Sequence, residues 1–278
     1  MKKSAGVLLA TAVLALTSAC GQSGSDVGAA ASGEADRADT AAAADESPSD
    51  APLTRDNFAE RLSAAQLDAG SAHIETTTSA SGMDVSMTGD VVIAKNLEDS
   101  ASRVSMDSSG MAMEVRVVEG NLYMKMGQMT GGKFVKIDLD DPDGAFAKSF
   151  GNLTEQIDPG EQLALFDEAL VEFENQGSGG EIDGVETSKL RLVLDTEKVL
   201  GANADAKKLG PKLPQQMEYV LFVGQDDLMR RMVADIAGTS TTTDWSRWGE
   251  DVEVEAPKKS EITDAPAFPF PTAGALDG

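Results

Sequence analysis

The fold is decided by three alternating stretches: Met83-Asp84-Val85-Ser86-Met87-Thr88, Met111-Ala112-Met113-Glu114-Val115-Arg116-Val117 and Leu122-Tyr123-Met124-Lys125-Met126. In each stretch a large apolar residue occupies every second position, which is the period of a β-strand with one apolar face. Short turns such as Ser81-Gly82 and Ser109-Gly110 separate these stretches from their neighbours, as in consecutive antiparallel hairpins. The sequence therefore predicts a meandering antiparallel sheet, with strands over residues 72–80, 83–94, 101–107, 111–119, 122–126 and 133–139.

Helix signals and further strands extend this sheet into one α+β domain over residues 53–257. Three helices are predicted, over residues 54–70, 159–173 and 195–209. Thr54 and Asp195 are the predicted N-caps, and Gly70 ends the first helix. Four more strands are predicted over residues 185–194, 217–223, 228–236 and 239–245. We expect a single large antiparallel sheet with the helices laid on one side.

The first twenty residues predict export and a lipid anchor. Lys2 and Lys3 precede an apolar run that is too short to span a bilayer, and small residues lead into Cys20, the only cysteine. This is typical of a signal peptide over residues 1–19 that ends in a lipobox. Cys20 would then carry a diacylglyceryl thioether, with palmitate among the expected acyl groups, and become the mature N-terminus. The alternative is ordinary cleavage after Ala19, which would release a soluble protein with one free thiol.

Two segments of biased composition flank the predicted domain. Residues 20–52 are almost entirely Ala, Ser, Gly, Asp and Glu, and cannot bury enough apolar surface to offset the chain entropy lost on folding. We predict a disordered tether with a reach of roughly 30 Å. Residues 258–278 are predicted to form an irregular C-terminal tail. The expected location is the extracytoplasmic face of the cell membrane, which the protein contacts through its anchor.

Charge and residue inventory exclude several classes of partner and chemistry. The chain has 23 Lys and Arg against 47 Asp and Glu, so we expect no nucleic-acid partner, because that requires a basic surface. His73 is the only histidine, which argues against a zinc site and against a Ser-His or Cys-His nucleophile. The acidic stretch 138–144 does not place ligands at the positions of an EF-hand. We expect no catalytic residue, no cofactor and no metal ion; an enzyme that uses carboxylates alone is the least favoured alternative.

The alternating strands are rich in methionine on their apolar face. Eight of the twelve methionines lie between Met83 and Met129, and Met adapts to irregular or changing apolar shapes. One interpretation is that these residues fill an ordinary core between the sheet and the helices. The other is a deformable cavity for an acyl chain. The candidate lining residues are Met83, Val85, Met87, Met111, Met113, Val115, Val117, Leu122, Met124 and Met126.

Motifs in the second half resemble those of a known family. They are Ile182-Asp183-Gly184-Val185-Glu186-Thr187, Leu228-Met229-Arg230-Arg231 and the segment from Asp244 to Pro257 with Trp245 and Trp248. In this order, behind a lipobox, they resemble the LppX/LprG family of actinobacterial envelope lipoproteins, whose fold is similar to that of the LolA lipoprotein carriers. The resemblance spans about residues 54–264, and the sequence departs from the family pattern at Phe222 and Gly224.

This resemblance implies a strongly curved antiparallel sheet, a half-barrel, whose concave side is closed by helices over a hydrophobic cavity for acylated lipids. The resulting hypothesis is a non-catalytic envelope lipoprotein that binds an acylated lipid or glycolipid and transports or presents it. The rival hypothesis is an interaction or adaptor lipoprotein with a closed core, no lipid ligand and an envelope protein as its partner. Trp245 and Trp248 are expected to pack at the edge of the sheet in either case.

Overall fold

The computed structural model describes residues 51–80, 83–96, 99–108, 111–138, 159–200 and 213–263. The strands among them, in chain order, are β1 (Ser71–Ala80), β2 (Met83–Val92), β3 (Ala101–Ser108), β4 (Met111–Val118), β5 (Asn121–Lys125), β6 (Phe134–Asp138), β7 (Leu170–Ile182), β8 (Val185–Asp195), β9 (Gln216–Gly224), β10 (Met229–Ile236), β11 (Thr239–Ser246) and β12 (Ile262–Thr263). The helices are α1 (Phe58–Ala69), α4 (Pro159–Ala169) and α5 (Thr196–Leu200), with short 3-10 turns η2 (Gly127–Thr130) and η4 (Lys259–Glu261).

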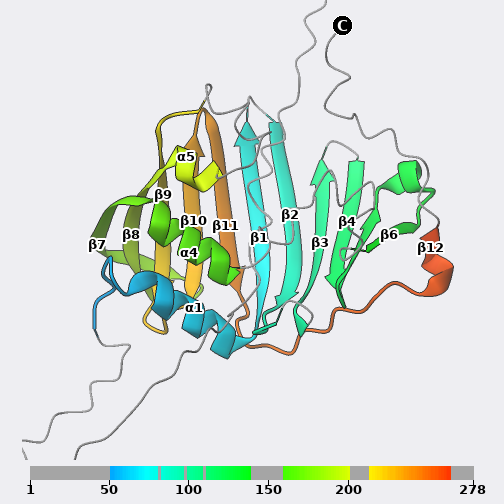
Figure 1. Ribbon diagram of the computed structural model, residues 1–278, viewed down its shortest axis with the longest axis horizontal. Coiled ribbons are helices and arrows are strands. Elements are labelled where there is room, and N and C mark those ends of the chain that lie inside the picture. The colour runs from blue at the N-terminus through cyan, green and yellow to red at the C-terminus, as the bar shows by residue number, and fades with distance from the viewer. Residues whose placement is uncertain are drawn as a thin grey trace, which may run out of the picture.

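These strands form one sheet of twelve, in the order β12-β6-β5-β4-β3-β2-β1-β11-β10-β9-β8-β7 (Figure 1). The pairs are antiparallel, apart from β12, which runs parallel to β6. Because β12 and β7 end the strand order and do not pair with each other, the sheet is open. This confirms the predicted fold class, an α+β fold built on one large antiparallel sheet. The meander from β1 to β6 also confirms the hairpins predicted from the alternating stretches.

The register assigns each residue to one of two faces. Cross-strand partners share a face and neighbours along a strand alternate between faces. Trp245 of β11 pairs with Ile74 of β1, and both pack in the core cluster that contains Phe58 and Leu62 of α1. We call the face that carries Trp245 and Ile74 the helix face, and the opposite one the polar face. Figure 1 shows α1, α4 and α5 lying across the half of the sheet from β7 to β11.

The helix ends follow the sequence signals in part. Gly70 ends α1 in the left-handed conformation, with φ of 74°, as predicted, and its N–H donates to the Gln66 carbonyl at 3.0 Å. The prediction that Thr54 is the N-cap is wrong: Asn57 takes that position, and its Oδ1 accepts from the Thr54 N–H at 2.7 Å. The side chain of Asp195 caps α5 as predicted, accepting from the Lys198 N–H at 3.0 Å. Residues 201–209 of the predicted third helix lie outside the described residues.

Strand β7 replaces the end of the second predicted helix. The helix was predicted to run to Phe173, but α4 ends at Ala169 and Leu170 begins β7. Phe173 therefore reaches the core from a strand, with its ring centroid 5.3 Å from that of Phe58. The pairing of β7 with β8 shifts register three times. The residues of β7 therefore do not alternate between buried and exposed, and that alternation is the pattern by which a strand is recognised in a sequence.

The two tryptophans lie near the middle of the sheet, so their prediction as edge residues is wrong. Trp245 is only 2% exposed, in β11 between β1 and β10. Trp248 packs against the same core, and its Nε1 donates to the Met229 carbonyl at 2.9 Å. Beyond it, the chain runs along the ends of the strands to η4 and β12 (Figure 1). The described fold thus continues to Thr263, past the domain boundary predicted at residue 257.

Gly89 marks a close approach between β2 and β3. A Cβ atom at this position would lie 2.9 Å from Cγ2 of Val104 and would also meet the Arg103 carbonyl oxygen. A glycine inside a strand often marks a bend or a close approach of two backbones. We infer that the absence of a side chain at Gly89 allows β3 to approach β2 this closely.

Candidate functional site

The residues predicted to line a cavity occupy one face of three strands. Val85 and Met87 lie in β2, Met113, Val115 and Val117 in β4, and Leu122 and Met124 in β5. The register places all of these on the helix face, since Thr76 of β1 pairs with Met87 and each further partner repeats the alternation. Met83 is the first residue of β2, Met111 is the first residue of β4, and Met126 follows the end of β5.

A row of methionines runs across this face. Thr76 pairs with Met87, Met87 with Met106, and Met106 with Met113, so one cross-strand row joins β1 to β4. We call these four residues the methionine row. A second row, the Trp245 row, runs parallel to it; its members are Trp245, Ile74, Gly89, Val104, Val115, Met124 and Val135.

The residues of β3 on this face were not among those predicted to line the cavity. Val104 and Met106 of β3 lie on the helix face between the predicted lining residues of β2 and β4. Their signal was present, because Ser102 to Asp107 alternates in the same way as the stretches on either side. The predicted set was therefore incomplete in its middle strand.

The helix face is divided into a covered half and a less buried half. The main core contains α1, α4 and the strands from β7 to β11, together with residues of β1 and β2. Val115, Val117 and Leu122 form a separate small cluster with Met113, Met124 and Ile137. Among the described residues no helix lies over β2 to β6 (Figure 1). Val85, Met87, Val104 and Met106 are only partly buried.

The opposite, polar face carries a hollow of about 520 Å³. Met87, Met106 and Met113 border it, because they belong to the strands that form its floor. Most of its lining belongs to the polar face, and the hollow is therefore not the cavity that the sequence predicted. The polar-face residues that line it are Glu75, Thr77, Ser86, Thr88, Ser105, Asp107, Ala112, Glu114 and Lys125.

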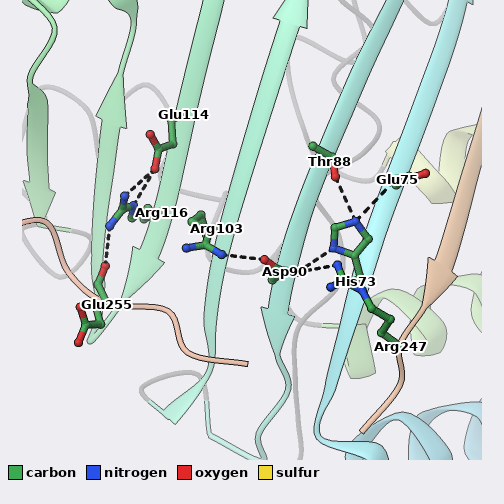
Figure 2. Close-up of polar contacts among 9 residues, drawn as sticks. All are labelled: His73, Glu75, Thr88, Asp90, Arg103, Glu114, Arg116, Arg247 and Glu255. Atoms are coloured by element: carbon green, nitrogen blue, oxygen red, sulfur yellow. Dashed lines mark hydrogen bonds and ion pairs between the residues drawn. The ribbon is translucent and has the colours of Figure 1, made fainter. Parts of the chain in front are cut away.

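A network of charged groups lies beside this hollow, at the lower ends of the same strands (Figure 2). Asp90 is at its centre: Oδ1 lies 2.7 Å from Nδ1 of His73, and Oδ2 accepts from Nη2 of Arg103 at 2.8 Å. Burial alone would raise the pKa of Asp90. The hydrogen bonds from His73 and Arg103 and their positive charge outweigh that effect and hold the pKa below its ordinary value. The network thus favours an ionised carboxylate.

The segment after β11 closes over this network. Ser71 Oγ donates to the Glu250 carbonyl at 2.6 Å. Figure 2 shows the second contact, in which Nη1 of Arg116 donates to the Glu255 carbonyl at 3.0 Å. Ala256 then packs beside Tyr123 and Phe134. These contacts tie the C-terminal segment to four strands of the meander, β1, β4, β5 and β6. His73 lies in the network beneath this segment, where it contacts Asp90 and Thr88.

The described residues contain neither a metal-binding cluster nor a membrane-spanning helix. Within the ranges that the structure describes, no cluster of three or more His, Cys, Asp or Glu side chains is suited to hold a metal ion. No helix in those ranges is long and apolar enough to cross a membrane. Cys20, the predicted signal peptide and residues 20–50 of the predicted tether lie outside the described residues.

Comparisons with known proteins bear on the fold. No model of a protein family matches the chain, and no curated protein matches it. The fold is similar to that of LprF from Mycobacterium bovis, at 17% identity and a TM-score of 0.50, covering 73% of this chain and 96% of that chain. A further similar structure is lipoprotein LppX from Mycobacterium tuberculosis, at 17% identity and a TM-score of 0.48, covering 73% of this chain and all of that one. The chain therefore has a fold similar to that of LprF.

Proposed function

We propose that this protein is a cell-envelope lipoprotein that binds the acyl chain of a lipid on the helix face of β2 to β5 and transports or presents it. The observation that carries the proposal is the methionine row. Met87, Met106 and Met113 lie side by side on three strands and remain partly exposed. The proposal includes no catalytic step.

Partial burial distinguishes this face from an ordinary core. Residues that fill a core are nearly inaccessible to water, as Leu190, Leu192 and Leu221 are at 0–1% exposure. A half-exposed apolar row leaves surface that an acyl chain can cover, and each methylene removed from water contributes about 0.8 kcal/mol. Methionine side chains adjust to a mobile chain at little cost. The face is therefore suited to a ligand that is apolar and variable in shape.

The predicted anchor supports the same function. Lipidation at Cys20, followed by a tether, would hold the domain on the extracytoplasmic face of the membrane, within reach of an acylated lipid or glycolipid. One of the similar structures, LppX, is itself a lipoprotein. An envelope protein that receives the lipid would be a further partner.

The test compares two substitutions of adjacent residues that point to opposite faces. Met106→Gln makes the helix face more polar with little change in side-chain length, and Ser105→Gln makes a similar side chain on the polar face. We expect Met106→Gln to weaken binding of palmitate about tenfold or more, because full burial of a Met side chain contributes about 1.5–3 kcal/mol and each 1.4 kcal/mol is tenfold in affinity. Ser105→Gln should leave binding unchanged. Equal effects of the two, with equal thermal stability, would contradict the proposal.

The polar hollow favours the rival hypothesis of an adaptor. Its lining of hydroxyl and carboxylate groups with Lys125 could receive a polar partner rather than a lipid chain. Protein purified without detergent and extracted with organic solvent distinguishes the two. Copurified acylated lipid supports the carrier. If no lipid is extracted and none binds when offered, the adaptor hypothesis replaces it.

A further inference from the structure

The polar hollow is a groove that crosses five strands, from β1 to β5. One wall is a cross-strand row, which we call the Glu75 row: Glu75, Thr88, Ser105, Glu114 and Lys125. The other wall, the Thr77 row, consists of Thr77, Ser86, Asp107 and Ala112. The two rows are about 7 Å apart, because they are separated by two residues along each strand. An elongated ligand can therefore lie across the strands between these walls.

The walls carry groups that donate and accept hydrogen bonds. Among the described residues that line the groove from the polar face, four have hydroxyl groups, three have carboxylates and one, Lys125, has an ammonium group. Apart from Glu114 and Lys125, these polar side chains are exposed. Water satisfies exposed groups of this kind, so a ligand that displaces the water must replace its hydrogen bonds.

This combination of groups selects the chemical class of the ligand. An acyl chain would leave the hydroxyl and charged groups without partners. An anion would be repelled by the three carboxylates, and a polyamine could not accept hydrogen bonds from the hydroxyls or from Lys125. A saccharide is neutral, and each of its hydroxyls both donates and accepts. The lining therefore fits a saccharide better than it fits a lipid chain, an anion or a cation.

His73 orients one end of the Glu75 row (Figure 2). Its Nδ1 lies 2.7 Å from Oδ1 of Asp90, and its Nε2 lies 3.2 Å from Oγ1 of Thr88 and 3.6 Å from Oε1 of Glu75. An ionised carboxylate can only accept, so the neutral imidazole carries its proton on Nδ1 and accepts at Nε2. The Thr88 hydroxyl then donates to Nε2, and its oxygen is left to accept from a ligand.

Glu114 is held in a similar way at the other end of the row. Its Oε1 accepts from Nε and Nη2 of Arg116 at 2.9 and 2.7 Å, as Figure 2 shows, and its Oε2 lies 3.5 Å from Nζ of Lys125. In the opposite wall, the exposed Asp107 has no ion-pair partner among the described residues and can accept from a ligand with both oxygens. Side chains that are already fixed lose less entropy when a ligand binds.

We propose that the polar hollow binds a neutral, linear oligosaccharide that lies across β1 to β5. The site is on the face opposite the methionine row, so it does not depend on the proposed function. Because the sheet separates the two faces, the saccharide is a chain of its own and not the head group of the bound lipid. The polar face thus gives the domain a second ligand.

The test screens the purified protein against an array of neutral, carboxylated and sulfated oligosaccharides, and calorimetry then measures its affinity for the strongest neutral ligand. We expect binding to neutral linear chains, tighter than to their monosaccharides because the groove crosses five strands. Asp107→Ala should weaken this binding about tenfold or more, as loss of one hydrogen bond to a charged group predicts. The matched control, Asp235→Ala, removes an exposed carboxylate of β10 outside the groove and should have no effect.

The opposite face supplies further controls. Met106→Gln and excess palmitate should leave saccharide affinity unchanged, and Asp107→Ala should leave palmitate affinity unchanged. If the array shows no binding to a neutral oligosaccharide, or if Asp107→Ala binds as wild type does, the saccharide site is overturned and the proposed function is unaffected. Competition by palmitate would place the sugar on the lipid face, and tighter binding of spermine than of any saccharide would assign the groove to a cation; either result overturns the proposal.

Discussion

Arg61 of α1 and Asp227 of the turn between β9 and β10 form a bidentate ion pair. Nε of Arg61 lies 2.8 Å from Oδ2, and Nη2 lies 2.7 Å from Oδ1, with both side chains 14% exposed. A bidentate pair of this kind fixes the relative orientation of the two side chains and also contributes to the stability of the fold. This pair attaches α1 to the turn that leads into β10, so it helps to hold the helix on the sheet.

We predict that Asp227→Asn lowers the free energy of unfolding by about 1–3 kcal/mol, since it weakens hydrogen bonds to a charged group that is largely buried. Asn tolerates the left-handed backbone at this position, where φ is 59°. Urea unfolding measures the loss. Asp235→Asn, at an exposed carboxylate in β10, is the control and should change stability by less than about 0.5 kcal/mol. Equal stability of the two variants would show that α1 does not depend on this pair.

The close approach at Gly89 gives a second prediction. Gly89→Ala should destabilise by about 1–3 kcal/mol, because the added methyl group meets Val104 and the backbone of β3. Gly70→Ala has open space but a φ of 74°, so it should cost about 1 kcal/mol through backbone strain alone. Thermal unfolding compares the two variants. A Gly89→Ala protein as stable as wild type would mean that β2 and β3 are not held close together.

Much of this fold could be predicted from local patterns, because β1 to β6 alternate regularly and are joined by short turns. β7 could not, since its three glycines at Gly177, Gly179 and Gly180 and its bulges remove the alternation that marks a strand. The central place of Trp245 and the pairing of β12 with β6 depend on contacts between segments far apart in the chain.

The candidate site shows the same division. Which residues are apolar on each strand is visible in the sequence, and so the methionines of β2, β4 and β5 were identified. Their alignment into a row needs the register, which depends on partners in other strands. The burial of Gln66 in α1 was not predicted, because a single amide on a helix stripe signals nothing until the helix is packed on the sheet.

The pKa of Asp90 predicts a dependence of stability on pH. Because the folded-state pKa lies below that of the unfolded chain, near 4, the unfolded state takes up the proton first as pH falls. The stabilisation is therefore complete above about pH 4 and is lost as pH drops through the lower, folded-state pKa. Asp90→Asn should cost about 1–3 kcal/mol near pH 5.5 and clearly less near pH 3. Urea unfolding at both pH values checks this, and a pH-independent difference would contradict it.

Lipid anchoring predicts the fate of a Cys20→Ser protein. Without the thiol no thioether can form, so this variant should remain uncleaved or appear in the culture medium, whereas wild type should partition into detergent with the membrane fraction. Acyl chains contribute about 0.8 kcal/mol for each buried methylene, and two chains retain a protein stably. Fractionation and mass spectrometry of the N-terminus measure both properties. A wild-type protein with an unmodified, soluble N-terminus would contradict the anchor.

The most direct measurement of the central claim is photo-crosslinking with a palmitate analogue that carries a benzophenone near the end of its chain. Benzophenone reacts readily with methionine, and peptide mass spectrometry locates the adducts. The account predicts adducts at Met106 and Met113 that excess palmitate suppresses. Met129, which is 58% exposed and lies in η2, is the internal control for reaction at the surface. Adducts mainly at Met129, or adducts that excess palmitate does not reduce, would contradict lipid binding on the methionine row.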